Sequence, residues 1–245
     1  MTDSSTTPST PDTTFTNVVT LPGTVEQAVP NVKGFDADVQ LTPHQAASFF
    51  DQGYRFCVRY VGRRQMNPTR DLTPPEARVI LEAGLALMIV QHVEAPGWHP
   101  TGALGTEYGA NAAQFTRALG VPKGVAVWCD LECVHPDTTT ADAIAFCNAW
   151  FDEVKAAGYE PGLYVGDEPG LTATQLFNKL KFRRYWGAYN VNADQEPITR
   201  GWQLKQRVGT GGTIADVTTE KYDDDTTRTD KLGDNVVWLA APFVG

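Results

Sequence analysis

The stretch Val127-Trp128-Cys129-Asp130-Leu131-Glu132 decides the expected fold of this chain. It is an apolar run that ends in two acids, and residues two apart in a β-strand point to the same face. Trp128, Asp130 and Glu132 are therefore expected to project together, while Cys129 and Leu131 face the opposite side. In a parallel α/β barrel the strand ends at the mouth where active sites are built. The stretch predicts a barrel strand with two carboxyl groups at the mouth.

Short apolar runs alternate with amphipathic stretches on both sides of this strand, which is the pattern of βα units around a parallel sheet. The chain is of the class α/β, and we predict a single (β/α)8 TIM-type barrel over residues 32–245, irregular in its last strands. Expected strands cover 32–37, 55–61, 85–93, 124–131, 162–165, 184–189 and 201–205. Expected helices cover 42–53, 73–84, 108–119, 140–157 and 172–180. Either 222–224 or 236–239 closes the barrel.

Residues 1–31 are predicted to be a disordered tail and a linker. The first 14 are almost wholly Ser, Thr, Pro and Asp, which bury too little apolar surface to fold. The tail lacks the basic and apolar regions of a signal peptide, and no apolar run in the chain is long enough to span a bilayer. We expect a soluble protein that acts at the cell envelope or outside the cell by a non-classical route, and in the cytoplasm otherwise. The tail is a candidate contact for a protein assembly partner.

The charge and the cysteines exclude several classes of function. A net charge of -9 and a pI near 4.9, without any Lys/Arg-rich stretch, argue against duplex nucleic acid and against anionic membranes. The four cysteines lie in or beside apolar segments and are expected to be buried thiols. Cys129, Cys133 and nearby His135 lack the paired knuckles of a structural zinc site. We expect no metal and no cofactor.

Two carboxyl groups beside a Trp suit glycoside cleavage. This reaction needs one carboxyl group that stays protonated near neutral pH and one that stays ionised beside the developing positive charge. Glu132 lies nearer the mouth and is assigned as general acid, with Asp130 as its charged partner. A third acid, Asp36, ends the expected first strand and points at the same mouth. The plain alternatives are that the pair caps a turn or binds a Lys or Arg, and that Asp36 is a helix cap.

The connection from 92 to 106 is long for a βα loop, and such loops usually build the site of a barrel. Trp98 in this loop, Gln91 at the end of the strand before it and Trp128 beside the acids are candidate substrate-binding residues. The same loop carries His92, Glu94 and His99, which leave a metal-dependent hydrolase as one hypothesis.

A series of motifs along residues 32–225 resembles a known domain. The motifs are Gly34-Phe35-Asp36, Asp130-Leu131-Glu132, Gly158-Tyr159-Glu160-Pro161-Gly162-Leu163-Tyr164, Tyr185-Trp186-Gly187-Ala188-Tyr189 and Trp202-Gln203. Together they resemble the glycoside-hydrolase-like domain of unknown function 1906 and, more distantly, the glycoside hydrolase family 25 muramidases.

The resemblance implies a sugar site with the Glu of the Asp-x-Glu element as acid. Carried over by motif, it implies Asp36, Asp130, Glu132 and Tyr164 as lining residues. It also implies an Asp late in the chain, for which Asp216 and Asp223 both fit. Platform residues implied for the sugar rings are Trp186, Tyr189, Trp202 and Gln203. For each aromatic residue the plain alternative is core packing.

One departure concerns the second strand, which carries Arg59 where the muramidases carry an acidic motif. We expect Arg59 to pair with Asp36 or Asp130, which lowers the pKa of that carboxyl group. Two functions remain in competition. The first is hydrolysis of a bacterial cell-wall glycan of the peptidoglycan type. The second is a non-catalytic barrel that binds cell-wall glycan in a secreted or phage-related assembly.

Overall fold

The computed structural model describes residues 19–242, so residues 1–18 of the predicted tail lie outside the described part. Its elements follow in the order β1 (Thr24–Gln27), β2 (Lys33–Ala37), α1 (Pro43–Asp51), β3 (Phe56–Val61), α2 (Pro74–Glu82), β4 (Ala86–Gln91), α3 (Gly102–Ala118), β5 (Ala126–Leu131), α4 (Thr140–Ala156), β6 (Glu160–Val165), α5 (Ala173–Lys179), β7 (Arg184–Gly187), the 3-10 helix η1 (Ala193–Gln195), β8 (Leu204–Val208), β9 (Tyr222–Thr227) and β10 (Val237–Ala240).

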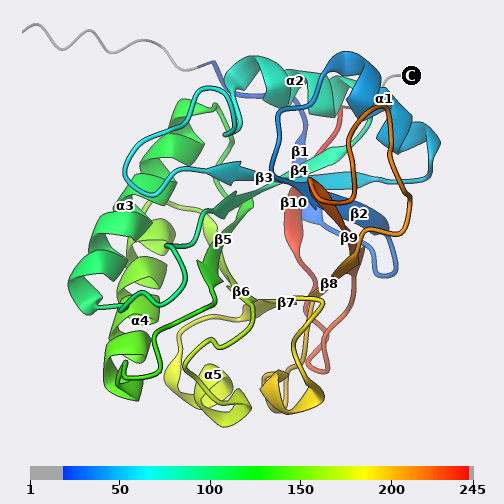
Figure 1. Ribbon diagram of the computed structural model, residues 1–245. Helices are drawn as coiled ribbons and strands as arrows, with labels where there is room; N and C mark the ends of the chain where they lie inside the picture. The colour runs from blue at the N-terminus through cyan, green and yellow to red at the C-terminus, as the bar shows by residue number, and fades with distance from the viewer. Residues whose placement is uncertain (1–18, 243–245) are drawn as a thin grey trace, which may run out of the picture.

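Strands β2 to β9 close into an eight-stranded barrel with α1 to α5 around it (Figure 1). Neighbouring strands from β2 to β8 are parallel, and β5 pairs with both β4 and β6. The last strand of the barrel, β9, runs antiparallel to both of its neighbours, β8 and β2. The TIM-type prediction with irregular last strands is confirmed. Of the two candidates for closure, the segment 222–227 forms the closing strand.

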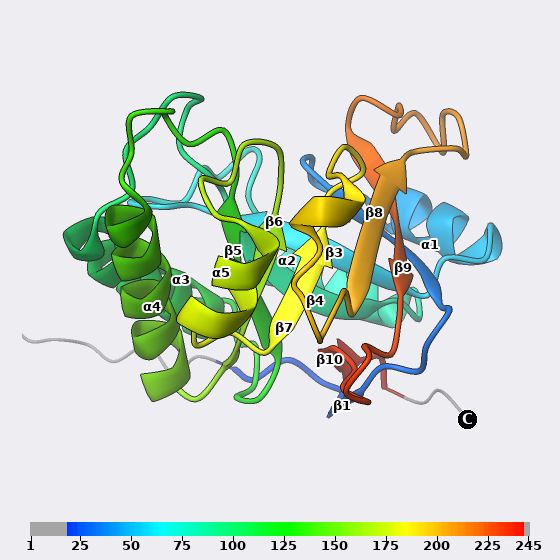
Figure 2. The same cartoon turned by 90° about the horizontal axis from the view of Figure 1, so that it is seen from below.

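The other candidate, β10, lies outside the barrel and pairs with β1. This antiparallel pair lies at the end of the barrel opposite to the long loops of the mouth (Figure 2). Ala28, Val236 and Trp238 from these segments pack into the apolar cluster inside the barrel. The prediction of a linker missed β1, because Thr24-Val25-Glu26-Gln27 has a single apolar residue and is stabilised by β10, whose paired residues lie more than 200 positions later.

Each of the five α-helices within residues 19–242 begins after a threonine whose hydroxyl accepts a hydrogen bond from a backbone N–H of the first turn. This side-chain cap satisfies a donor that the helix leaves free. Helix α3 begins at Gly102, six residues before the predicted start, so the preceding loop is shorter than expected. The missed signal was Thr101 as N-cap.

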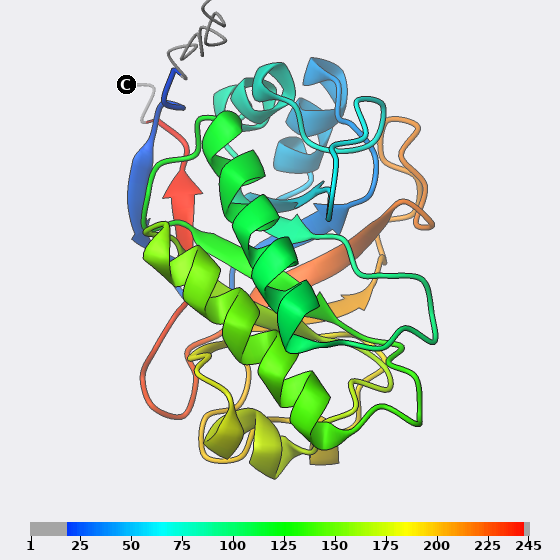
Figure 3. The ribbon, with the colours of Figure 1, turned by 90° about the vertical axis from the view of Figure 1, so that its left-hand side faces the viewer.

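Helices α3 and α4 lie side by side against one flank of the barrel (Figure 3). Two glycines of α3 allow this close contact. A Cβ at Gly105 would lie 2.2 Å from the Phe146 carbonyl oxygen, and one at Gly109 would lie 2.7 Å from the Trp150 carbonyl oxygen. Both distances are shorter than van der Waals contact, so a larger residue would push the two helices apart.

The barrel separates two apolar cores by strand alternation. The inside of the barrel is filled by Phe56, Val58, Met88, Trp128 and Trp186. The alternate residues of the same strands point outward and pack in the core under the helices. Trp128 and Asp130 face inward while Cys129 and Leu131 belong to the outer core, as predicted. Cys57, Cys129 and Cys147 are buried free thiols, and Cys133 is half-buried and free.

The seventh barrel strand, β8, begins three residues later than predicted. Gly201 has φ +77°, a left-handed backbone conformation that interrupts an extended strand, and β8 starts only at Leu204. Trp202 and Gln203 therefore precede the strand at its end remote from the mouth, and Gln206 takes the position near the mouth.

Candidate active site

Four carboxyl groups meet at the mouth of the barrel. Asp36 is the penultimate residue of β2, Asp130 and Glu132 come from β5 and the residue after its end, and Asp225 comes from β9. Asp36, Asp130 and Asp225 are buried, and Glu132 is half-buried. The strand-end positions predicted for the first three acids bring them to one mouth.

Asp36 is held by two donors. Tyr60 Oη donates to Oδ1 at 3.0 Å, and Gln206 Nε2 donates to Oδ2 at 2.8 Å. Burial raises the pKa of Asp36 to about 7, although the hydrogen bonds from Gln206 and Tyr60 lower it. Gln206 in turn accepts from the Tyr164 hydroxyl at 3.0 Å, so β2, β3, β6 and β8 are joined by one chain of hydrogen bonds.

Asp225 lies beside Asp36 inside the barrel. Its Oδ1 accepts from Trp186 Nε1 at 2.9 Å, and its Oδ2 is buried without a hydrogen-bond partner among the described residues. Burial and the nearby Asp36 carboxylate raise the pKa of Asp225 well above its usual range. The charge of Asp36 opposes the ionisation of Asp225, and two adjacent buried carboxylates cannot both stay charged near neutral pH. The pair therefore retains at least one proton.

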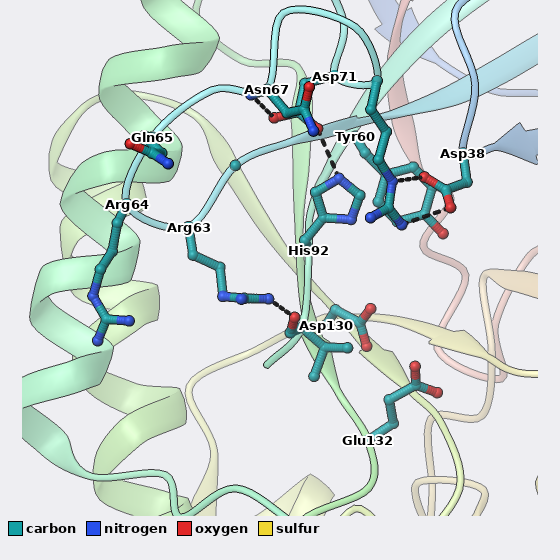
Figure 4. Close-up of a pocket in the computed structure, with 13 residues that line it drawn as sticks. Asp38, Tyr60, Arg63, Arg64, Gln65, Asn67, Asp71, His92, Asp130 and Glu132 are labelled. Atoms are coloured by element: carbon teal, nitrogen blue, oxygen red, sulfur yellow. Dashed lines mark hydrogen bonds and ion pairs between the residues drawn. The ribbon is translucent and has the colours of Figure 1, made fainter. Parts of the chain in front are cut away.

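Asp130 and Glu132 project into a cavity of about 700 Å³ (Figure 4). Burial raises the pKa of Glu132, and the Asp167 carboxylate raises it further. Burial and the Glu132 and Asp36 carboxylates raise the pKa of Asp130 well above normal, while Arg63 lowers it. Asp130 Oδ1 is buried and has no hydrogen-bond partner among residues 19–242. Both groups are therefore available as proton donors over a wider pH range than exposed acids.

The position of Glu132 depends on two neighbours. Trp98 Nε1 donates to the Glu132 carbonyl oxygen at 2.9 Å and so fixes the backbone just after β5. A Cβ at Gly166, just after β6, would lie 2.2 Å from Glu132 Oε2 and 2.4 Å from its Cβ. Glycine at 166 thus leaves the space that the glutamate side chain occupies.

The β3–α2 loop forms the other wall of the cavity and supplies three arginines. Arg63 and Arg64 pair with Glu94 at 3.2 Å, and Arg70 pairs with Asp38. Each is partly exposed. The wall therefore presents cations that are already balanced by carboxylates.

The expected partner of Arg59 was wrong. Arg59 is fully buried and points away from the lumen, where its Nε donates to Glu76 Oε1 on α2 at 2.7 Å. On β3 the inward positions are 56, 58 and 60, so Tyr60, one residue later, contacts Asp36. Gln91 also faces outward: its amide donates to the Tyr108 carbonyl at 2.9 Å and accepts from Trp150 Nε1 at 2.8 Å.

The predicted aromatic residues fall into three groups. Trp128, Tyr164 and Trp186 lie inside the barrel, and the Trp186 ring contacts each of the other two rings edge to face. Trp98 and Trp202 pack in the outer core, which is the alternative that the sequence left open for each aromatic residue. Gln203 is buried with them and accepts from the Tyr185 N–H at 2.6 Å. Tyr189 is 52% exposed after the end of β7, so it alone among the predicted aromatics has a largely free ring face.

The two candidates for the late acid lie in different places. Asp216 is exposed at a turn of the β8–β9 loop, away from the other acids. Asp223 is half-buried on β9, directly opposite Asp36, and its charge raises the Asp36 pKa. Sequence reasoning missed Asp225, and it also missed Gln206 and Tyr60. The two-residue alternation of a strand was the available signal for two of them: Asp225 lies two residues after Asp223, and Gln206 lies two residues after Leu204.

The three potential metal ligands of the 92–106 segment have separate partners. His92 pairs with Asp71, Glu94 with arginines, and the His99 ring lies 4.4 Å from that of His135. Within residues 19–242 no group of three His, Cys, Asp or Glu side chains is placed to hold a metal ion. The donor set of the metal hypothesis is not assembled.

The family of the chain follows from comparison with known domains. The family model described as "Rv2525c-like, glycoside hydrolase-like domain" matches residues 47–230, which include three of the four acids. The chain belongs to this family. The barrel of this Rv2525c-like domain also includes β2, which lies before the matched segment and supplies Asp36. A search of curated proteins gave no significant match.

Solved structures share the fold of this Rv2525c-like domain. The Tat-secreted protein Rv2525c of Mycobacterium tuberculosis, in complex with L-tartrate, matches with a TM-score of 0.60 and 14% identity over 82% of this chain and 98% of that one. The bacterial lysozyme of Streptomyces coelicolor matches with 0.54 and 15% over 82% and 93%. A family 25 glycosyl hydrolase from Bacillus anthracis matches with 0.51 and 14% over 81% and 89%. In the described part of the chain, no helix is both long and apolar enough to span a membrane.

Proposed function

We propose that this domain hydrolyses bacterial cell-wall glycan of the peptidoglycan type, with Glu132 as general acid and Asp130 as its charged partner. The observation that carries the proposal is the placement of both carboxyl groups on the wall of one large cavity, with the raised pKa of a half-buried Glu132. A general acid needs contact with the ligand and a proton at the working pH, and the position of Glu132 on the cavity wall and the upward shift of its pKa favour this role.

Asp130 lies deeper and has fewer compensating contacts. One of its oxygens is without a partner, and Glu132 and Asp36 both oppose its ionisation. A positive charge on the sugar ring in the transition state would offset that cost and favour the ionised form. We infer that Asp130 stabilises this charge, while Asp36, Asp225 and Gln206 hold the floor of the site in place.

The nature of the glycan is inferred from similarity. The structural neighbours include a lysozyme and a family 25 glycosyl hydrolase, which is consistent with an amino-sugar polymer as substrate. The exposed Tyr189 ring at the rim offers an apolar face of the kind that pyranose rings contact. Since Rv2525c is a Tat-secreted protein, we place the activity at the cell envelope or outside the cell.

The test measures new reducing ends after incubation of the purified protein with bacterial cell walls. The parent should release them, and Glu132→Gln should lower the rate by roughly 10²- to 10⁴-fold, which is the usual contribution of general acid catalysis. Glu220→Gln is the matched control, because Glu220 is exposed on the β8–β9 loop. Wall binding by the parent and by Glu132→Gln without any release would contradict hydrolysis and support the glycan-binding barrel instead.

A further inference from the structure

His92 and Asp71 form a hydrogen-bonded pair on the cavity wall that the proposed mechanism does not use. His92 Nε2 lies 2.8 Å from Asp71 Oδ1, and both residues line the same cavity as Asp130 and Glu132. In Figure 4 the pair lies above Asp130, while Glu132 lies below it. The pair and the two acids therefore face one ligand space.

The surroundings of Asp71 favour its ionised form. Its side chain is 2% exposed, and its second oxygen accepts from the Asn67 N–H at 2.7 Å. Burial raises the pKa of Asp71, but the hydrogen bonds from His92 and Asn67 and the charge of Arg59 together lower it by more, so the net shift is downward. An ionised carboxylate only accepts hydrogen bonds, so Nε2 of His92 must carry the hydrogen.

The imidazole is fixed in its plane as well as at Nε2. Its ring stacks on Tyr60 with a centroid distance of 4.6 Å and an angle of 23°, and the Tyr60 hydroxyl is itself bound to Asp36. In a neutral imidazole with hydrogen on Nε2, Nδ1 is an acceptor. Within residues 19–242 no group hydrogen-bonds to this Nδ1, and in Figure 4 it lies on the side of the ring away from Asp71.

We propose that His92, oriented by Asp71, is a ligand-binding residue whose Nδ1 accepts a hydrogen bond from a hydroxyl or amide N–H of the bound glycan. This inference rests on the proposed function for the nature of the ligand, but not on cleavage. A preoriented acceptor selects sugars that present a donor at this point and disfavours those that present a carbonyl or an ether oxygen. His92 thereby contributes to substrate selection, while Glu132 supplies the proton.

The test uses the full chain labelled with ¹⁵N at histidine, with the tetrasaccharide of β-1,4-linked N-acetylglucosamine as probe. The chain has four histidines, so the His92 signals are assigned by comparison with His92→Phe. At pH 8 the spectrum should show hydrogen on Nε2 and a bare Nδ1, and addition of the tetrasaccharide should shift the Nδ1 signal. Hydrogen on Nδ1 in the free protein, or an unchanged Nδ1 signal at saturating tetrasaccharide, would overturn the inference.

Affinity gives a second measurement. His92→Phe keeps a ring that can stack on Tyr60 but removes the acceptor, and we expect about a tenfold rise in Kd for the tetrasaccharide, as for one hydrogen bond of ~1.4 kcal/mol. His44→Phe, at an exposed position on α1, should leave Kd unchanged. Equal affinities of the parent and His92→Phe would refute the role. A shifted Nδ1 signal without wall cleavage would refute hydrolysis but leave the binding role of His92 intact. Wall cleavage with an unchanged Nδ1 signal would support hydrolysis and refute the binding role of His92.

Discussion

Replacement of Asp36 by Asn should remove a large part of the pH dependence of stability. The folded protein keeps a proton on Asp36 up to about pH 7, whereas the unfolded chain releases it near the usual value of 3.8. Between these values the folded state binds more protons than the unfolded state. The free energy of unfolding therefore falls as the pH rises through this window.

The size of the effect follows from the width of the window that the experiment crosses. From pH 5 to the folded pKa of about 7 is two units, and each unit corresponds to ~1.36 kcal/mol, so Asp36 lowers the free energy of unfolding by about 3 kcal/mol. This is a large share of the 5–15 kcal/mol that stabilises a typical domain. The side chain of Asp36→Asn cannot ionise, so the decrease in the free energy of unfolding between pH 5 and pH 7 should be smaller in this variant than in the parent by about 3 kcal/mol.

The assay is urea denaturation at pH 5, 6, 7 and 8, followed by tryptophan fluorescence. Asp216→Asn serves as control, because Asp216 is exposed at a turn. The control should follow the parent at every pH. An equal loss of stability from pH 5 to 8 in the parent and in Asp36→Asn would show that the buried carboxyl group does not hold its proton, and the account of the carboxyl pair would fail.

Two further changes test the packing around the site. Gly166→Ala places a Cβ 2.2 Å from Glu132 Oε2 and should lower the rate of reducing-end release at least tenfold. Gly102→Ala is the control, because its Cβ would lie at an ordinary 3.5 Å from the Ala145 Cβ and should leave the rate unchanged. Equal rates in the two variants would refute the steric argument. Arg59→Met leaves the Glu76 carboxylate buried without its cation and should lower the free energy of unfolding by about 3–5 kcal/mol in urea denaturation, and a second change, Glu76→Leu, should recover most of the loss. A loss under 1 kcal/mol for Arg59→Met would contradict the buried ion pair.

The barrel could be predicted because its signals are local. The β5 stretch is apolar, ends in two acids and keeps the two-residue alternation, and each helix begins at a threonine cap that the sequence displays. This alternation predicts that Asp130 and Glu132 share one face, and the end of a parallel barrel strand predicts that they lie at the mouth. The same reasoning failed where the register was uncertain, because a shift of one residue on β3 exchanges Arg59 for Tyr60 at the lumen.

The late acid could not be selected from sequence because β9 contains three consecutive aspartates, a residue type that is rare in strands. Only the pairing with β2 shows that Asp225 points inward while Asp224 points outward and accepts from the Tyr54 hydroxyl at 2.6 Å. Likewise, the local sequence of β8 does not reveal that Gly201 delays the strand. The first error concerns contacts between segments that are far apart in the chain, whereas the second concerns the left-handed backbone of Gly201, which the sequence leaves open because glycine adopts many backbone conformations.

The antiparallel strand β9 also determines when the site can form during folding. The backbone N–H of Val32, just before β2, donates to the hydroxyl oxygen of Thr227 at the end of β9, across 195 positions of the chain. Contacts of such long range cost more loop entropy and form more slowly than the local βα contacts. During synthesis β2 to β8 emerge before β9, and because burial is the main cause of the raised pKa of Asp36, we expect Asp36 to keep its ordinary acidity until β9 packs beside β2. The proton on the carboxyl pair is therefore taken up at the closing step, and uptake of protons during refolding reports that step directly.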